Sequence, residues 1–298
     1  MSANHVPLLP PHRRLSTAKI AALALLLVLL QACSAVKVAY GQAPALLSWQ
    51  LDSYLDLSSL QKARLAGDMD QLHAWHRKTQ LPLYAEFLAK NRPRFAQDWS
   101  KAQACTAFSE AKTQLQPALD QLESVGSWLL PDLSKKQLAY LENKLADSNA
   151  KWRDEWLDVS AEALLKTRYK QLLSRSEFLY GDLAAEQKKA IRSLLEKSSF
   201  DARKSYALRI ARQTEFLELV RQASPATAEA DRLKAQALVQ SLLARDAQTT
   251  TPYQADLRDE GCALFADIHN LTTPAQRLRA VSTLKAYEED LLALAVRG

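Results

Sequence analysis

Residues 133–159 read LSKKQLAYLENKLADSNAKWRDEWLDV, and this stretch decides the fold class. Its apolar side chains recur every three or four residues, which is the spacing of one face of an α-helix. They are Leu138, Leu141, Leu145, Trp152, Trp156 and Val159. Almost every other segment shows the same period, and no alternating run of β-branched residues is long enough for a strand. We therefore predict an all-α multi-helix bundle.

Prolines, a glycine and capping residues mark the ends of the expected helices. Breaks are expected at Pro82, Pro93, Pro131, Gly181, Pro225, Pro252 and Pro274. The predicted helices span 45–56, 59–80, 82–91, 94–126, 135–173, 184–221, 226–247, 253–269 and 274–296. We expect residues 45–298 to form a single all-helical domain.

Four helix starts can be superposed, at residues 58–61, 134–137, 184–187 and 273–276. Three of them begin with Ser or Thr, and all four end with Gln, the pattern of a capping box worth about 1 kcal/mol. Asp-Leu precedes the first three. Seven positions past the cap come Leu65, Leu141, Ile191 and Ala280, and nineteen past it the first three carry Arg77, Arg153 and Arg203. We interpret the four segments as irregular helical-hairpin repeats; four independent capping solutions are the alternative.

The first 32 residues have the layout of an export signal. Arg13, Arg14 and Lys19 precede an apolar run over residues 20–30, which is shorter than the roughly 20 residues needed to span a bilayer. The following Leu30-Gln31-Ala32-Cys33 resembles the lipobox of bacterial lipoproteins. This resemblance implies removal of residues 1–32, lipid on the Cys33 thiol and a lipidated tether over residues 33–44. An ordinary signal peptide with a chance cysteine and a retained membrane anchor are the alternatives.

Anchoring at Cys33 would place the protein in the bacterial cell envelope. Ser34 stands where an Asp would favour retention at the inner membrane, so by analogy we expect the outer membrane, facing the periplasm. Without residues 1–32 the chain has 36 basic and 33 acidic residues, a net charge of +3 that demands no nucleic acid. Cys105 and Cys262 form an even pair in an oxidising compartment, and we expect a disulfide between them.

Two family resemblances extend this interpretation. The lipobox, Tyr40, Trp49, Tyr54-Leu55-Asp56-Leu57 and Trp75-His76-Arg77 together resemble an uncharacterised family of proteobacterial lipoproteins defined as a domain of unknown function. The helix starts at 57–61, 133–137 and 272–276 are more weakly similar to the Leu-Thr-x-x-Gln motif of the Spy/CpxP periplasmic proteins. The second resemblance implies an all-helical protein that acts as an ATP-independent chaperone.

Catalytic and metal-binding motifs are weak in this sequence. Asp70, His73 and His76 share one helix, but Asp70 and His76 lie about 120° apart around its axis, a poor chelate without ligands from elsewhere. A half-buried His76 beside Trp75 is the expected outcome. We find no zinc-protease motif, nucleophile elbow or phosphate-binding loop, so we predict no enzyme, metal or cofactor.

Basic residues concentrate on the segment between Gln187 and Arg212, with a local net charge of +6. A solvated helix face would explain them; contact with lipopolysaccharide, anionic phospholipid or acidic clients is the functional alternative. The candidate binding residues are Arg77, Arg153, Arg192, Arg203, Lys204, Arg209 and Arg212. We expect a non-enzymatic lipoprotein that binds envelope components, and a Spy-like holdase activity is the specific form of this expectation. A structural lipoprotein docking one envelope protein through Trp49 and Tyr54 is the alternative, and the sequence leaves the oligomeric state open.

Overall fold

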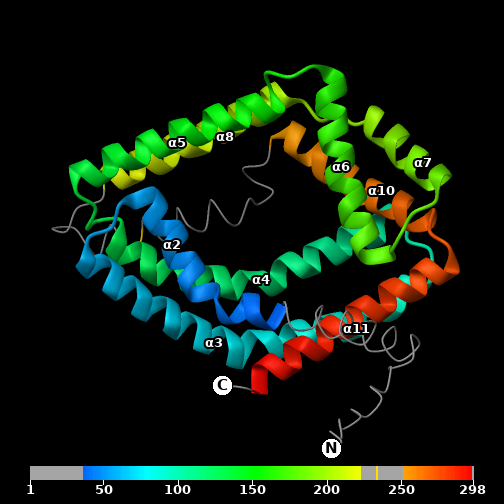
Figure 1. Ribbon diagram of the computed structural model, residues 1–298, viewed down its shortest axis with the longest axis horizontal. Helices are drawn as coiled ribbons and strands as arrows, with labels where there is room; N and C mark the ends of the chain where they lie inside the picture. Colours follow the sequence, from blue (N-terminus) through cyan, green and yellow to red (C-terminus); the bar gives the residue numbers. More distant parts are fainter. Residues whose placement is uncertain (1–35, 223–232, 234–250, 297–298) are drawn as a thin grey trace, which may run out of the picture. The chain divides into compact units, whose positions relative to one another are not determined.

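The computed structural model describes residues 36–222, 233 and 251–296 (Figure 1). The chain divides into two units, residues 1–41 and 42–298. In the described part of the first unit, residues 36–41 are helical. The described residues contain helices and no strand, which confirms the predicted all-α class. The signal peptide, Cys33 and nearly all of the helix expected at 226–247 lie outside the described residues.

Nine α-helices and one 3₁₀ helix make up the described part of the second unit. They are α2 (Ala43–Leu55), α3 (Ser59–Asn91), η1 (Arg92–Ala96), α4 (Lys101–Leu129), α5 (Lys135–Trp156), α6 (Ala161–Tyr180), α7 (Ala185–Glu196), α8 (Ala202–Gln222), α10 (Pro252–Asn270) and α11 (Pro274–Val296).

Capping boxes begin several of these helices. At the start of α3, Ser58 Oγ accepts the Gln61 amide at 3.3 Å and Gln61 Oε1 accepts the Ser58 amide at 2.9 Å. The same reciprocal pair occurs at α5 and α11, as the sequence predicts. It also occurs at α4 and α10, through Gln103 and Gln254, which the four superposed segments did not include.

The four superposed helix starts meet in two pairs. Between the first and second, Gln137 Nε2 donates to Gln61 Oε1 at 2.7 Å and to the Asp56 carbonyl at 3.2 Å. Gln61 Nε2 in turn donates to the Asp132 carbonyl at 3.1 Å. Each glutamine thus caps its own helix and also bonds the backbone two residues before the partner's cap. Two helix starts that are 76 residues apart in sequence are thereby joined.

The third and fourth starts repeat this arrangement. Gln187 Nε2 donates to the Leu271 carbonyl and to Gln276 Oε1, both at 2.8 Å, and Gln276 Nε2 donates to the Asp182 carbonyl at 2.9 Å. The residues seven positions past each cap are all buried: Leu65, Leu141, Ile191 and Ala280. The four segments therefore occupy equivalent structural positions, paired first with second and third with fourth.

Pro82 does not break the helix that contains it, contrary to the prediction. A helical proline lacks the amide that would bond to the carbonyl four residues earlier, and its ring crowds that carbonyl. Yet α3 is continuous from Ser59 to Asn91. Leu81 and Ala85 beside the proline are both buried, and α11 packs along α3. Tertiary packing thus outweighs the local helix penalty here.

Two predicted long helices are each divided in the structure. The helix expected at 135–173 is α5 and α6, because Ser160 caps a new helix by accepting the Ala163 amide at 3.2 Å. The helix expected at 184–221 is α7 and α8, because Asp201 Oδ1 accepts the Lys204 amide at 3.0 Å. Ser198 and Ser199 at the second break bond Glu260 of α10. The apolar period continues through both breaks, so periodicity alone did not show them.

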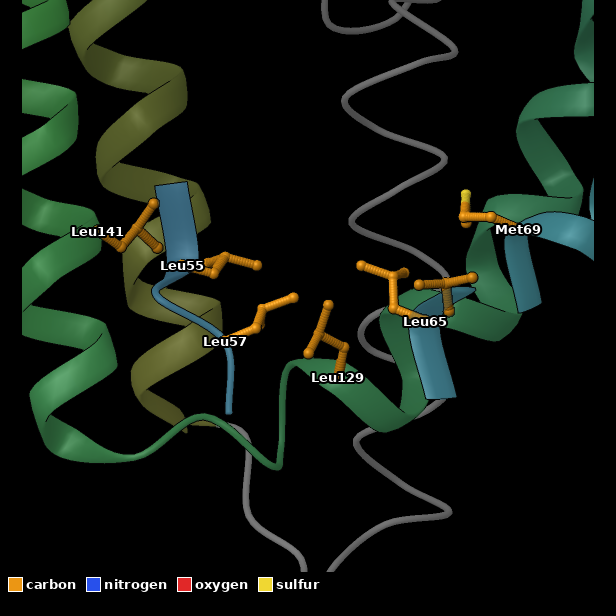
Figure 2. Close-up of a cluster of buried hydrophobic side chains, with 7 residues drawn as sticks. Leu55, Leu57, Leu65, Met69, Leu129 and Leu141 are labelled. Carbon is orange, nitrogen blue, oxygen red and sulfur yellow. The ribbon is translucent and has the colours of Figure 1, made fainter. Parts of the chain in front are cut away.

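Three buried clusters stabilise the second unit. The first joins the start of α3 to the ends of α2 and α4 and to α5, and Figure 2 shows Leu57 and Leu129 pointing toward one another within it. The second surrounds Trp99 and Cys262, and the third surrounds Tyr180 and Ile191. Leu57, Leu133 and Leu183, which precede the first three caps, belong to or pack against these clusters.

Helices that pack together are mostly distant in sequence. In Figure 1, α3 runs beside α11, and α5 runs beside α8. The last pair is antiparallel, because Glu142 near the start of α5 bonds Arg221 near the end of α8, while Trp152 stacks on Tyr206. Among the described helices, none is both long enough and apolar enough to cross a membrane.

Candidate functional site

The basic segment between Gln187 and Arg212 is not one helix face, contrary to expectation. Its residues belong to α7 and α8, and several bond within the chain. Arg192 contacts Glu162 at 2.8 Å and Glu196 at 3.2 Å. Arg209 donates to Asn149 Oδ1 at 2.7 Å and to Ser148 Oγ at 2.8 Å.

The remaining residues of this segment differ in their surroundings. Arg212 donates to the Leu208 carbonyl at 3.0 Å, and the Lys204 ammonium lies 5.4 Å from the centre of the Tyr253 ring. Arg203 is exposed. Arg192 and Arg209 therefore hold α7 and α8 against neighbouring helices, and these contacts reduce the availability of the two side chains to an anionic ligand.

The three arginines of the repeat lie on three helices. Arg77 is half-buried on α3. Arg153 at the end of α5 bonds Asp158 at 3.0 Å, and Arg203 lies at the start of α8. The antiparallel packing of α5 and α8 brings the end of α5, with Arg153, and the start of α8, with Arg203, to the same region. The Arg153 side chain, however, is bonded to Asp158 in the loop after α5. A shared binding surface of the three arginines stays a prediction.

The histidines of α3 show no chelating arrangement. His76 is half-buried, and its ring contacts Tyr84 edge-on with centroids 5.4 Å apart. Burial, followed by repulsion from His73, lowers the pKa of His76. Within residues 36–222 and 251–296, no cluster of three or more His, Cys, Asp or Glu side chains could hold a metal ion.

An apolar groove lies between α6 and α10, with one wall completed by α4. Its volume is about 380 Å³, which falls in the range of ligand pockets. α4 contributes Phe108; α6 contributes Leu172, Arg175, Ser176, Leu179 and Tyr180; α10 contributes Gly261, Leu264, Phe265 and Ile268. Eight of these ten residues are apolar or aromatic or lack a side chain. A second hollow, between α3 and α4, is lined by Glu86, Lys90 and Glu110 and is far more polar.

Gly261 keeps part of this groove open. A Cβ atom added to it would meet no atom within 4 Å, although it lies inside α10. Glycine in a helix interior costs about 1 kcal/mol relative to alanine, so its presence weakens α10 and leaves space beside Leu264 and Phe265.

Tyr180 joins the groove to a buried hydrogen-bond network. Tyr180 donates its hydroxyl to His269 Nδ1 at 2.8 Å, and His269 Nε2 donates to the Gln97 carbonyl at 2.7 Å. Because a carbonyl can only accept, the neutral ring carries its proton on Nε2. Burial lowers the pKa of His269 and raises the pKa of Tyr180, which favours the neutral form of both groups. Phe95 and Trp99 pack against the imidazole.

A disulfide fixes two walls of the groove. Cys105 of α4 and Cys262 of α10 are bonded; their Cα atoms are 5.1 Å apart and their positions differ by 157 in sequence. Cys105 lies one helical turn before Phe108, and Cys262 follows Gly261. The pair expected from the sequence is thus present in the structure, and it holds the α4 wall against the α10 wall.

Arg175 is the only charged residue of the groove lining. It is exposed and forms no ion pair with any residue in the described part of the chain. A groove of this kind can bury apolar side chains or an acyl chain and can pair one carboxylate or phosphate with the guanidinium. Besides Arg175, the polar groups of the lining are the hydroxyls of Ser176 and Tyr180, and the Tyr180 hydroxyl is bonded to His269.

The groove residues carry no sequence pattern that predicts a groove. Leu172, Leu179 and Leu264 carry the ordinary apolar period of helices, which predicts burial in a core. The one local signal is Gly261, a glycine inside a helical pattern with no turn to require it. The groove exists because α4, α6 and α10 meet, and these helices lie far apart in the sequence.

The geometry defines an all-helical protein with a disulfide-braced apolar groove. A family of unknown function (DUF6279) matches residues 53–246, about two thirds of the chain, and the protein belongs to this family. This confirms the resemblance to an uncharacterised domain. No curated protein and no solved structure gives a significant match.

Proposed function

We propose that this protein is a non-enzymatic, lipid-anchored lipoprotein of the bacterial envelope that holds apolar segments of unfolded envelope proteins. The observation that carries the proposal is the solvent-open groove between α6 and α10, whose lining is apolar except for Arg175 and Ser176. Burial of an apolar side chain releases about 1.5–3 kcal/mol, so a few such contacts give useful affinity.

The lipid anchor in this proposal rests on the sequence Leu30-Gln31-Ala32-Cys33 after a short apolar run. The Cys105–Cys262 disulfide supports an oxidising compartment, because disulfides are rare in the cytosol of most organisms. Cleavage before Cys33 would leave these two cysteines as one bonded pair and Cys33 as the single acceptor for lipid. We place the anchored protein at the outer membrane, facing the periplasm.

The occupant we propose is a polypeptide segment with apolar side chains near a carboxylate. The apolar side chains would lie along Leu172, Leu179 and Leu264, and the carboxylate would pair with Arg175 at the edge. Such a site needs no nucleotide, which suits a holdase outside the cytoplasm. The weaker likeness to Spy/CpxP proteins at the helix starts supports the same activity.

Filling the groove tests the proposal. Gly261→Leu adds a side chain where a Cβ meets nothing within 4 Å, and it should stabilise α10 by about 1 kcal/mol through helix propensity. Gly67→Leu is the matched control, because Gly67 also lies inside a helix with open space around it, on α3. Binding of permanently unfolded, carboxymethylated α-lactalbumin is measured by fluorescence anisotropy, and suppression of aggregation by light scattering.

We expect Gly261→Leu to weaken client binding on the order of tenfold, since about 1.4 kcal/mol of lost contact corresponds to that factor. Gly67→Leu should bind as the unchanged protein does. Arg175→Glu should weaken binding of this acidic client and spare a basic one. Equal binding by the two glycine variants would refute the groove as the client site. Preferential binding of phospholipid monomers would replace the polypeptide with a lipid ligand.

The anchor is tested separately by intact mass. The mature chain purified from membranes should begin at Cys33 and carry the mass of its acyl chains, and Cys33→Ser should release it to the soluble fraction. A membrane-extracted chain that retains residues 1–32 would overturn the assignment.

A further inference from the structure

One side of α2 is exposed, apolar and uncharged. Leu46, Leu47 and Trp49 are 55%, 49% and 64% exposed. Leu46 and Trp49 are three residues apart and therefore share a face of the helix. No charged residue occurs between positions 43 and 51, a stretch in which Gln50 is the largest exposed polar side chain.

The opposite side of α2 is firmly held. Leu55 is buried in the first core cluster, and Leu51 and Tyr54 pack against that cluster. Asp52 bonds Lys62 at 2.8 Å and accepts the Leu57 amide at 2.9 Å, and these interactions with α3 and its preceding loop fix the end of the helix. Tyr54, expected at the sequence level to be an exposed docking aromatic, is thus part of the core. α2 therefore packs on the core with one side and exposes its apolar side.

We propose that this side of α2 lies in the lipid–water interface of the bilayer that holds the protein's own anchor. The inference rests on the proposed lipidation of Cys33. Ala43 lies ten positions after Cys33, a span of at most about 35 Å when fully extended, so the anchor keeps α2 within reach of the same membrane surface.

The composition of the exposed side fits a bilayer interface. Tryptophan is enriched at the level of the lipid headgroups, because its ring is apolar and its N–H is polar. Leu46 and Leu47 can enter the acyl boundary beside it, and the lack of charge removes the desolvation cost that a carboxylate would bring. Attachment itself comes from the acyl chains; α2 then sets which side of the second unit faces the membrane.

The mature chain starting at Cys33 provides a direct test. Because Cys105 and Cys262 are bonded, the Cys33 thiol can be coupled selectively to a maleimide lipid in vesicles of phosphatidylethanolamine and phosphatidylglycerol, 3:1. Brominated acyl chains then quench tryptophans that enter the bilayer. We expect quenching in the unchanged protein and its loss in Trp49→Phe. Equal quenching in both proteins would overturn the proposal.

A second measurement uses the untethered chain from residue 34 in flotation with the same vesicles. The double substitution Leu46→Ser with Trp49→Ser should weaken partitioning at least on the order of tenfold. The matched control is Phe178→Ser with Leu278→Ser, since these side chains are 64% and 65% exposed on α6 and α11. Equal losses in both double variants would overturn the assignment.

Other occupants of this surface give different results. A second copy of the chain would produce a dimer in sedimentation that disappears in the Leu46 and Trp49 variant, without vesicle binding, and would refute the membrane assignment. A protein partner captured through Trp49 in the absence of lipid would refute it as well. Because the thiol is coupled chemically, the vesicle result does not depend on acylation of Cys33 in cells, which the intact mass reports separately.

Discussion

Replacing Gln137 with alanine should cost more than the loss of an ordinary helix cap. The side chain accepts the Ser134 amide at 3.0 Å and donates to Gln61 Oε1 at 2.7 Å and to the Asp56 carbonyl at 3.2 Å. A net hydrogen bond contributes about 1 kcal/mol, and an acceptor left without a partner in a buried junction costs further. We expect Gln137→Ala to lower the free energy of unfolding by about 3 kcal/mol.

Gln103→Ala is the matched control for this prediction. Gln103 accepts the Ser100 amide at 2.7 Å in a capping box on the exposed start of α4, and its loss should cost about 1 kcal/mol. Urea unfolding followed by far-ultraviolet circular dichroism, with the disulfide intact, measures both variants. The double variant of Gln61 and Gln137 should be less destabilised than the sum of the single variants, because both lose the same bond. Equal costs for Gln137→Ala and Gln103→Ala would refute the paired-junction argument.

Three further predictions concern a turn, the disulfide and a buried histidine. Gly181 has φ +79° and ψ −168°, a backbone conformation that is nearly exclusive to glycine. Gly181→Ala should therefore lower the free energy of unfolding by about 1–3 kcal/mol. An unchanged midpoint of urea unfolding would contradict this prediction. Serine at both Cys105 and Cys262 should lower the free energy of unfolding by up to about 5 kcal/mol, the chain-entropy value for a 157-residue loop, read from the same urea curves. Burial lowers the pKa of His269 below its usual 6.5. Just below pH 6.5, His269 is therefore protonated in the unfolded chain but stays neutral in the folded chain. The unfolding free energy should therefore fall as pH decreases below about 6.5. His269→Gln should make this dependence on pH weaker between pH 6.5 and 5, and the part that remains is due to His76. An unchanged dependence on pH would exclude His269 as its source.

The helical class and most helix starts were predictable because their causes are local. Ser58 with Gln61 and Ser134 with Gln137 form capping boxes within four residues of sequence, and the apolar period shows which residues face inward. Leu65 and Leu141 follow at the same distance from the two caps and are buried, as this register requires. The shared register also indicated that the segments are structurally equivalent.

The errors occurred where non-local packing or an overlooked cap changed the local preference. Pro82 predicts a break, but the buried side chains beside it and α11 keep α3 continuous. Ser160 and Asp201 carry the correct signal for a helix start, yet the uninterrupted apolar period around them favoured one long helix. A cap hydrogen bond is therefore better evidence of a boundary than the continuation of a period.

The sequence by itself determined that the chain is helical, where its caps lie and which faces are apolar, because these properties depend on residues a few positions apart. The tertiary structure decided that Gln61 meets Gln137, that Arg192 and Arg209 are used for internal contacts, and that α4, α6 and α10 enclose a groove. These outcomes depend on contacts between residues 30 to more than 170 positions apart. No local sequence pattern determines which two capped helix starts pack against each other.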